Sequence, residues 1–207
     1  MLSRKSAAVL TVAIGLGTSV YAQSTELAKN ASFLFNGIQK NIQQATTPDA
    51  SRIAAFLNPT QDCAPLCLTP VRYSGAIPTV GEQDVINFLG SAVASGDGLL
   101  IDARTPDDRA RGFIAGSVNV PHALVGPDNP YMPDIMQAFG ARSFDGMLNF
   151  TDALPLVVFD DGPSTLDAPQ MITALLAAGY PSEKISYYRG GMLVWTALGL
   201  NTEDAKS

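Results

Sequence analysis

The chain has 207 residues, with 13 Lys and Arg against 19 Asp and Glu, one His and two Cys. This length suits one domain of ordinary size with a short extension. A content of 46% hydrophobic and 15% charged residues excludes global disorder. The net charge of −6 argues against a nucleic-acid-binding protein, which would need a dense basic face. A single His excludes a His-rich metal centre, and we expect neither a metal nor a cofactor.

Residues 1–22 are typical of a secretory signal peptide. Arg4 and Lys5 form a positive start, residues 7–17 are apolar, and a cleavage site follows Ala22. The alternative is a retained membrane anchor, but the apolar run is shorter than the ~20 residues that cross a bilayer. We therefore expect a periplasmic protein with no membrane span after cleavage. Removal of the two cations takes the charge from 13 − 19 = −6 to 11 − 19 = −8.

Cys63 and Cys67 form a C-x3-C pair. In an oxidising compartment such a pair usually closes a disulfide, and so short a loop stabilises a fold by only about 2 kcal/mol. One alternative is a redox-active or partner-capturing dithiol, although the spacing is not the C-x-x-C of redox proteins. A metal site is the other alternative, and two thiols alone make a poor one. We expect a structural disulfide.

Residues 23–78 are predicted to form an N-terminal extension. Two strands at 31–35 and 38–43 are expected around Asn36-Gly37, a dipeptide that favours a two-residue hairpin. The competing interpretation is one helix over 27–44. A short helix opens at 48–51, and an irregular connector with three prolines covers 63–78.

Residues 79–202 alternate between apolar runs and helix-like segments, and residues 203–207 form a tail. Strands are expected at 98–102, 117–120, 155–159 and 185–188. Helices are expected over 81–89, from Thr105 onward, over most of 129–150, over 171–179 and over 192–198. Because strands alternate with helices, the sequence predicts an α/β domain whose central, mostly parallel sheet is covered by helices on both faces.

Four segments of this region resemble the rhodanese-like, or sulfurtransferase-like, domain family. They are Leu99 to Asp108 with its Asp-x-Arg-x-Pro pattern, Gly112 to Pro121, the strand Leu156 to Asp160, and Tyr188-Arg189-Gly190-Gly191 with Trp195. The resemblance covers about residues 79–202, and the motifs occur in the family's order. It implies a rhodanese-like fold, and it implies that the loop after the strand at 155–159 corresponds to the active site.

A catalytic member of that family carries sulfur as a persulfide on a Cys directly after this strand. A loop of backbone N–H groups can hold such a thiol as a thiolate. Here Asp160 stands at the Cys position. Some relatives have a second thiol in a Gly-Pro-x-Cys loop, but Gly162-Pro163-Ser164 is followed by Thr165. We therefore expect a member without the active-site Cys and without catalytic residues.

Two interpretations of the loop carboxylates remain open. Asp160 either accepts the N–H bonds of its own loop, or lines a cation- or amine-binding pocket together with Asp161. With Asp167 the two would repel thiosulfate-like donors. A phosphatase-like Cys-x5-Arg loop is excluded, since the loop contains neither residue.

Four further residues are assigned supporting roles. Asp102 and Arg104 are expected to be a structural carboxylate and its partner that support the loops. His122 is given a surface or packing role, and Trp195 is placed in the core.

The favoured hypothesis is an exported, non-enzymatic module that binds an unknown protein or small ligand through residues 160–165. The first alternative is a sulfur-transfer or thiol-redox enzyme in which Cys63 or Cys67 replaces the missing thiol. The second is a metal-dependent function at Asp160 and Asp161.

Overall fold

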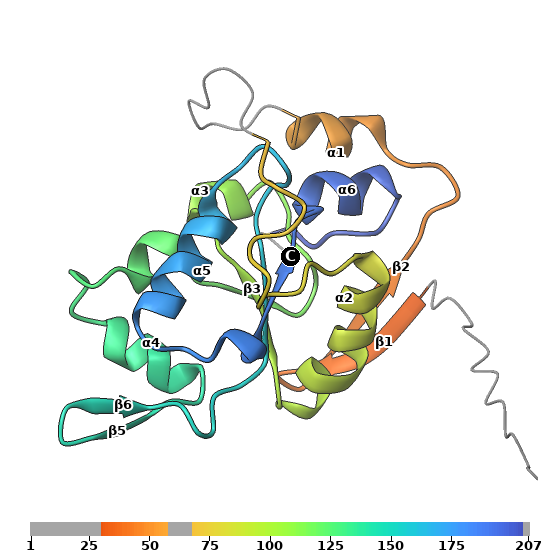
Figure 1. The fold of residues 1–207 in the computed structure, drawn as a ribbon. Coiled ribbons are helices and arrows are strands. Elements are labelled where there is room, and N and C mark those ends of the chain that lie inside the picture. Colours follow the sequence, from red (N-terminus) through yellow and green to blue (C-terminus); the bar gives the residue numbers. More distant parts are fainter. Residues whose placement is uncertain (1–29, 58–67, 205–207) are drawn as a thin grey trace, which may run out of the picture.

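The computed structural model describes residues 30–57 and 68–204. A four-stranded parallel sheet of order β4-β3-β7-β8 lies at the centre of the described part (Figure 1). Its strands are β3 (Leu99–Asp102), β4 (Ser117–Asn119), β7 (Leu156–Phe159) and β8 (Ile185–Tyr188). The predicted α/β class with a parallel sheet between helices is confirmed.

Helices cover both faces of this sheet. The α-helices are α1 (Ala50–Ala55), α2 (Glu82–Phe88), α3 (Pro106–Arg109), α4 (Met132–Ala138), α5 (Asp167–Ala177) and α6 (Gly191–Ala197). A π-helical segment, η1 (Leu89–Val93), and two 3-10 helices, η2 (His122–Val125) and η3 (Ser182–Lys184), accompany them. Successive strand side chains point to opposite faces. Ile101 and Val158 therefore pack with α4 and α5, whereas Leu100 and Val157 pack with α2 and α6.

The hairpin predicted near the start of the described residues is confirmed, and the competing helix is wrong. Strands β1 (Asn30–Phe35) and β2 (Ile38–Gln43) pair antiparallel around Asn36 and Gly37, whose φ angles are 50° and 76°. Those angles suit a tight hairpin turn. Phe33 and Ile42 are buried in the core on the α2 and α6 side of the sheet. The hairpin thus extends that core.

The mostly helical segment expected at 129–150 is wrong in its second half. Helix α4 ends at Ala138, and Gly140 follows with φ 91°. Strands β5 (Arg142–Phe144) and β6 (Met147–Asn149) then form a hairpin at the edge of the molecule (Figure 1). Asp145 and Gly146 turn it with φ angles of 49° and 77°. An Asp-Gly pair favours this turn for the same reason as Asn36-Gly37.

The connector after residue 67 runs along the free edge of β8. Thr79 forms a parallel bridge with Tyr187, and the Val80 N–H donates to the Tyr187 carbonyl at 2.9 Å. Cys63, Cys67 and the predicted signal peptide lie outside the described residues. Within 30–57 and 68–204, the helices are too short and too polar for any to cross a bilayer.

Candidate functional site

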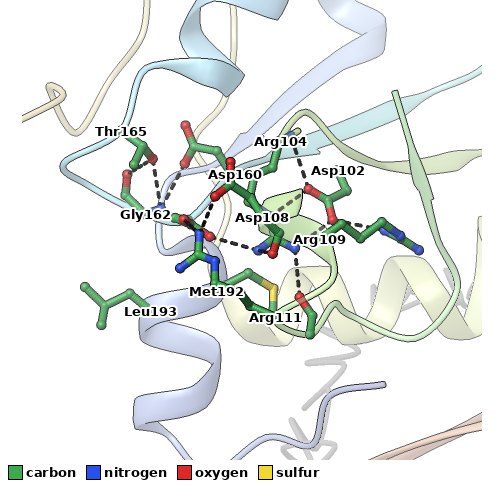
Figure 2. A network of polar contacts seen from close by, with 12 residues as sticks. Asp102, Arg104, Asp108, Arg109, Arg111, Asp160, Gly162, Thr165, Met192 and Leu193 are labelled. Atoms are coloured by element: carbon green, nitrogen blue, oxygen red, sulfur yellow. Dashed lines mark hydrogen bonds and ion pairs between the residues drawn. The ribbon is translucent and has the colours of Figure 1, made fainter. Parts of the chain in front are cut away.

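The loop that follows β7 lies at the carboxyl edge of the sheet, where ligands of parallel α/β domains bind. It runs from Asp160 to Leu166 and leads into α5. The start of α6 closes it from the other side, because the Met192 and Leu193 N–H groups donate to the Asp160 and Asp161 carbonyls at 3.0 and 2.9 Å. Figure 2 shows Met192 and Leu193 next to the loop.

Gly191 makes this close approach feasible. Its φ is 56°, and a Cβ on it would lie 2.6 Å from the Gly162 nitrogen. Glycine is the residue that fits both a positive φ and so close a backbone contact. The Gly-Gly pair singled out in the sequence therefore has a steric role in shaping the loop.

Asp160 is fully buried and binds its own loop (Figure 2). The Gly162 N–H donates to Oδ1 and the Ala168 N–H donates to Oδ2, each at 3.0 Å. Burial raises the pKa of Asp160 to about 7, although hydrogen bonds from Ala168, Thr165 and Gly162 act to lower it. This arrangement is the first of the two that the sequence left open for Asp160.

Asp161 points the other way, into a group of arginines. Arg104 Nη1 lies 2.8 Å from its Oδ1, and Arg111 Nη2 contacts its Oδ2. Both carboxylate oxygens are therefore occupied by guanidinium groups. Groups of the protein itself bind both carboxylates, so Asp160 and Asp161 are not available as ligands for a cation.

Arg104 is the centre of this network and is fully buried. Its Nε and Nη2 atoms bind the two oxygens of Asp102 at 2.8 Å each, as a bidentate pair. The remaining N–H groups reach Asp161 and the carbonyls of Asp108 and Gly112 at 2.8, 3.1 and 2.9 Å. All five guanidinium donors are satisfied. Burial acts to lower the pKa of Arg104, but Asp102 and Asp161 raise it overall.

The network is balanced in charge. Arg109 adds a second cation on Asp102 at 2.9 Å, and Arg111 adds Asp108 at 2.8 Å. Its charged members are three arginines and three aspartates: Asp102, Arg104, Asp108, Arg109, Arg111 and Asp161. The expectation that Asp161 would help repel anionic donors is therefore wrong, because its charge is neutralised within the fold.

The N-terminal extension contacts both the arginine network and the loop. On one side, Phe56 is buried against the network, with its ring centroid 5.8 Å from the Arg104 guanidinium and 5.3 Å from that of Arg111. On the other side, the Thr69 N–H donates to the Pro163 carbonyl at 2.7 Å. Arg189 donates to the Thr69 carbonyl at 2.9 and 2.7 Å. The extension thus contacts the arginine network through Phe56 and the loop through Thr69.

The structure brings together most of the predicted site residues. Asp102 and Arg104 form the expected supporting pair, and Trp195 is in the core as predicted. The sequence analysis did not single out Arg109 and Arg111. The signal that could have indicated them is that both follow closely after Asp102 and Arg104 in the chain. Cys63 and Cys67 lie outside the described residues. In the described part of the chain, no three His, Cys, Asp or Glu side chains lie close enough to hold a metal ion.

His122 also has a place that its sequence context did not indicate. It opens η2, and its Nδ1 atom lies 3.2 Å from Oδ1 of Asp167, the first residue of α5. Asp167 is buried, and the imidazole side chain is 25% exposed. His122 therefore contacts the first residue of the helix that follows the loop.

Comparison with family models gives a match over more than half of the chain. The model of the rhodanese-like domain matches residues 87–198. None of the curated proteins matches the chain.

Solved structures show more distant likenesses. A protein of unknown function from Rhodopseudomonas palustris, described as a possible tyrosine phosphatase, is 20% identical with a TM-score of 0.46, over 63% of this chain and 88% of that one. A Bacillus halodurans protein is 11% identical with a TM-score of 0.46, over 61% and 77%. A rhodanese-like domain from an Anabaena species is 19% identical with a TM-score of 0.42, over 61% and 79%.

Proposed function

This chain belongs to the rhodanese-like domain family, and we propose that it is an exported member without sulfurtransferase activity. Its role is to bind a protein or small ligand through the face of the loop at residues 160–165. Fold alone does not decide this, because one fold supports many functions, so the proposal depends on the chemistry of the loop.

The observation that carries the proposal is the state of Asp160. Sulfur transfer through a persulfide needs a thiolate at the end of β7, stabilised by the N–H groups of the loop. The side chain at that position is a carboxylate, which cannot form a persulfide. It already accepts the Gly162 and Ala168 N–H groups at 3.0 Å. Two of the N–H groups at this position are therefore used by the protein itself.

The activity test uses the mature chain, beginning at Gln23. Incubation with thiosulfate and cyanide should release no thiocyanate above the level of a heat-denatured sample. A catalytic rhodanese assayed in parallel establishes that turnover would be detected. Steady turnover by the mature chain would overturn the proposal that the family's chemistry is absent.

The binding role is tested by site-specific cross-linking in cells. A photo-reactive amino acid at Ser164 reports on the loop face. The same group at Glu183 is the matched control, because η3 precedes β8 and lies at the opposite edge of the sheet. We expect a cross-linked species from position 164 alone. Equal products from both positions, or none from either, would contradict recognition through the loop.

A second candidate function is thiol chemistry by Cys63 or Cys67, and one contact favours it. Thr69 binds Pro163 of the loop through both its N–H and its hydroxyl, at 2.7 and 3.0 Å. Thr69 is two positions after Cys67 in the chain, with one residue between them. The contact made by this near neighbour of Cys67 in the sequence is what favours thiol chemistry as the second candidate.

Alkylation followed by mass spectrometry separates the two candidates. The proposed disulfide predicts that iodoacetamide labels Cys63 and Cys67 only after reduction. A free, readily alkylated thiol in the isolated protein favours the second candidate. Any thiol-redox or sulfur-transfer activity of the protein must then be lost in a Cys63→Ser/Cys67→Ser variant.

Export is proposed from the first 22 residues alone. Cell fractionation should recover the protein in the periplasm, and N-terminal sequencing should read from Gln23. A Lys5→Glu variant with Arg4→Glu, which reverses the positive start, should accumulate uncleaved in the cytoplasm. A full-length protein in the cytoplasm of wild-type cells would refute export.

A further inference from the structure

A single residue fastens the connector after residue 67 to the loop. Between Leu68 and Ala76, Thr69 is the only buried residue, with 4% of its surface exposed. The Leu68 and Val71 side chains on either side of it are 70% and 66% exposed. Burial of apolar surface therefore does not hold residues 68–71 in place, and the polar contacts of Thr69 hold them instead.

Each polar group of Thr69 has a partner on the loop, on β8 or directly after β8. Its N–H and its hydroxyl both donate to the Pro163 carbonyl, at 2.7 and 3.0 Å. Its carbonyl accepts from Nε and Nη2 of Arg189 at 2.9 and 2.7 Å. The Tyr187 hydroxyl donates to the Thr69 hydroxyl at 3.3 Å. These three partners thus bind the backbone on both sides of one residue together with its hydroxyl.

Such contacts are those by which proteins bind extended peptides. Backbone N–H and C=O groups are common to most residues, so their partners supply affinity, whereas a side-chain contact supplies specificity. Here the hydroxyl contact distinguishes Thr and Ser from other residues. Pro70 follows Thr69, and a residue before proline is restricted to extended conformations. This restriction lowers the entropy that a Thr-Pro segment loses when it binds.

We propose that the Pro163 carbonyl, the Arg189 guanidinium and the Tyr187 hydroxyl form a binding site for an extended peptide segment with Thr-Pro at its centre. Residues 68–71 of the chain occupy this site in the structure, and a segment of the same kind from a partner protein takes their place. The inference rests on the proposed binding function, since it names the partner chemistry that the loop face recognises.

The site is accessible to such a segment. Pro163, Ser164 and Arg189 are each partly exposed. The chain's own segment competes with an effective concentration in the millimolar range, which is typical of a segment joined to its site by a short connection. Occupation by residues 68–71 therefore sets the affinity that a partner has to exceed.

The first experiment measures peptide binding by the isolated mature protein. The probe is the peptide Leu-Thr-Pro-Val with blocked ends, which repeats residues 68–71, and the NMR amide signal of Ser164 follows its binding. A Thr69→Gly variant should bind the peptide at least about fivefold more tightly than wild type, because its own segment has lost the hydroxyl and is more flexible. Equal affinities, or no saturable binding to the variant at about 10 mM peptide, above the effective concentration of the tethered segment, would overturn the inference.

A matched variant and a matched peptide control this result. Ser74→Gly places the same residue at an exposed position of the same connector, outside the contacts of Thr69, and should bind the peptide no better than wild type. The peptide Leu-Val-Pro-Val keeps the shape of the probe but lacks the hydroxyl. It should bind the Thr69→Gly variant about 3- to 10-fold more weakly, the effect of one neutral hydrogen bond. Equal binding of the two peptides would refute recognition of the hydroxyl.

Two substitutions on the other side of the contact, each added to Thr69→Gly, locate the site. Arg189→Met should weaken both peptides by at least about tenfold, because each loses the charge-assisted bond to its carbonyl. Tyr187→Phe keeps the buried ring and should reduce the difference between the two peptides. Trp195 fluorescence establishes that each variant is folded. Unchanged affinities in both folded variants would show that the peptide binds elsewhere and would overturn the inference.

The cross-linking at Ser164 separates this inference from the proposed function. A cross-link in cells without peptide binding in isolation would keep recognition through the loop and refute recognition of Thr-Pro. Peptide binding with the expected variant effects, but without a cross-link, would support the peptide site and contradict the role of the loop face in cells.

Discussion

Replacement of Arg104 by Met is the most demanding test of the charge network beneath the loop. The guanidinium is fully buried and uses all five of its N–H groups, on two carboxylates and two carbonyls. Removing one partner of a buried ion pair ordinarily costs about 3–5 kcal/mol, because the other charge stays buried. Asp102 and Asp161 keep a second arginine each, Arg109 and Arg111. We therefore expect a loss near the middle of that range, about 4 kcal/mol.

Urea unfolding measures this loss, with the fluorescence of Trp195 as the probe. Trp195 is the only tryptophan and is fully buried, so its emission reports on the folded core. The free energy of unfolding falls linearly with urea concentration. If the slope of that line is the same in the variant and in wild type, the substitution has changed stability rather than the compactness of the folded or unfolded state. An Arg104→Lys variant keeps the charge but has three donors in place of five, and should lose less.

The matched control is Arg142→Met, at the exposed ion pair with Asp152, where the arginine side chain is 77% exposed. Such surface pairs contribute at most about 1 kcal/mol. If Arg104→Met lowered the free energy of unfolding by no more than Arg142→Met does, the network would not hold the loop and the reasoning from burial would be wrong.

Three further predictions concern the elements that enclose the loop. Phe56→Ala should lower the free energy of unfolding by about 3–5 kcal/mol, because removal of the buried ring beside Arg104 leaves a cavity. A loss below about 1 kcal/mol in urea unfolding would show that the extension packs loosely. Gly191→Ala should fail to yield folded protein, or should melt far below wild type by circular dichroism, since the new Cβ would lie 2.6 Å from the Gly162 nitrogen. Asp160→Asn tests the pH dependence: the folded pKa of Asp160 is raised to about 7, so its stabilising contribution is full below the unfolded value near 4 and is lost as the pH rises through 7. Wild type should therefore lose about 4 kcal/mol relative to Asp160→Asn between pH 4 and pH 8, and parallel stability curves would contradict the shift.

The sheet could be predicted because its information is local. The runs that became β3 and β7 are short, apolar and bounded by turn residues, and both strands lie where they were expected. The hairpin at 30–43 was signalled by Asn36-Gly37. The second hairpin carried the same kind of signal at Asp145-Gly146, but apolar residues at helical spacing before Gly140 dominated the interpretation of that segment.

The site was only partly predictable, because its contacts connect residues far apart in the chain. Asp102 and Arg104 are two residues apart, and their pairing followed from the motif. Asp161 lies 50 residues from Arg111, and Phe56 comes from a different part of the chain. Nothing local indicates that His122 meets Asp167. Such contacts depend on the order of strands in the sheet, which brings the ends of β4 and β7 to one edge.

An aspartate at the end of β7 is compatible with this fold for a reason that also limits what the loop can do. N–H groups that converge at a loop and a helix start favour an anion. A carboxylate meets that requirement from within the chain, and the Gly162 and Ala168 N–H groups donate to its two oxygens. The neighbouring Asp161 is neutralised by two arginines. A loop held in this way gains order, and the side chain at the end of β7 is a carboxylate rather than a thiol. That is why we assign its face to recognition.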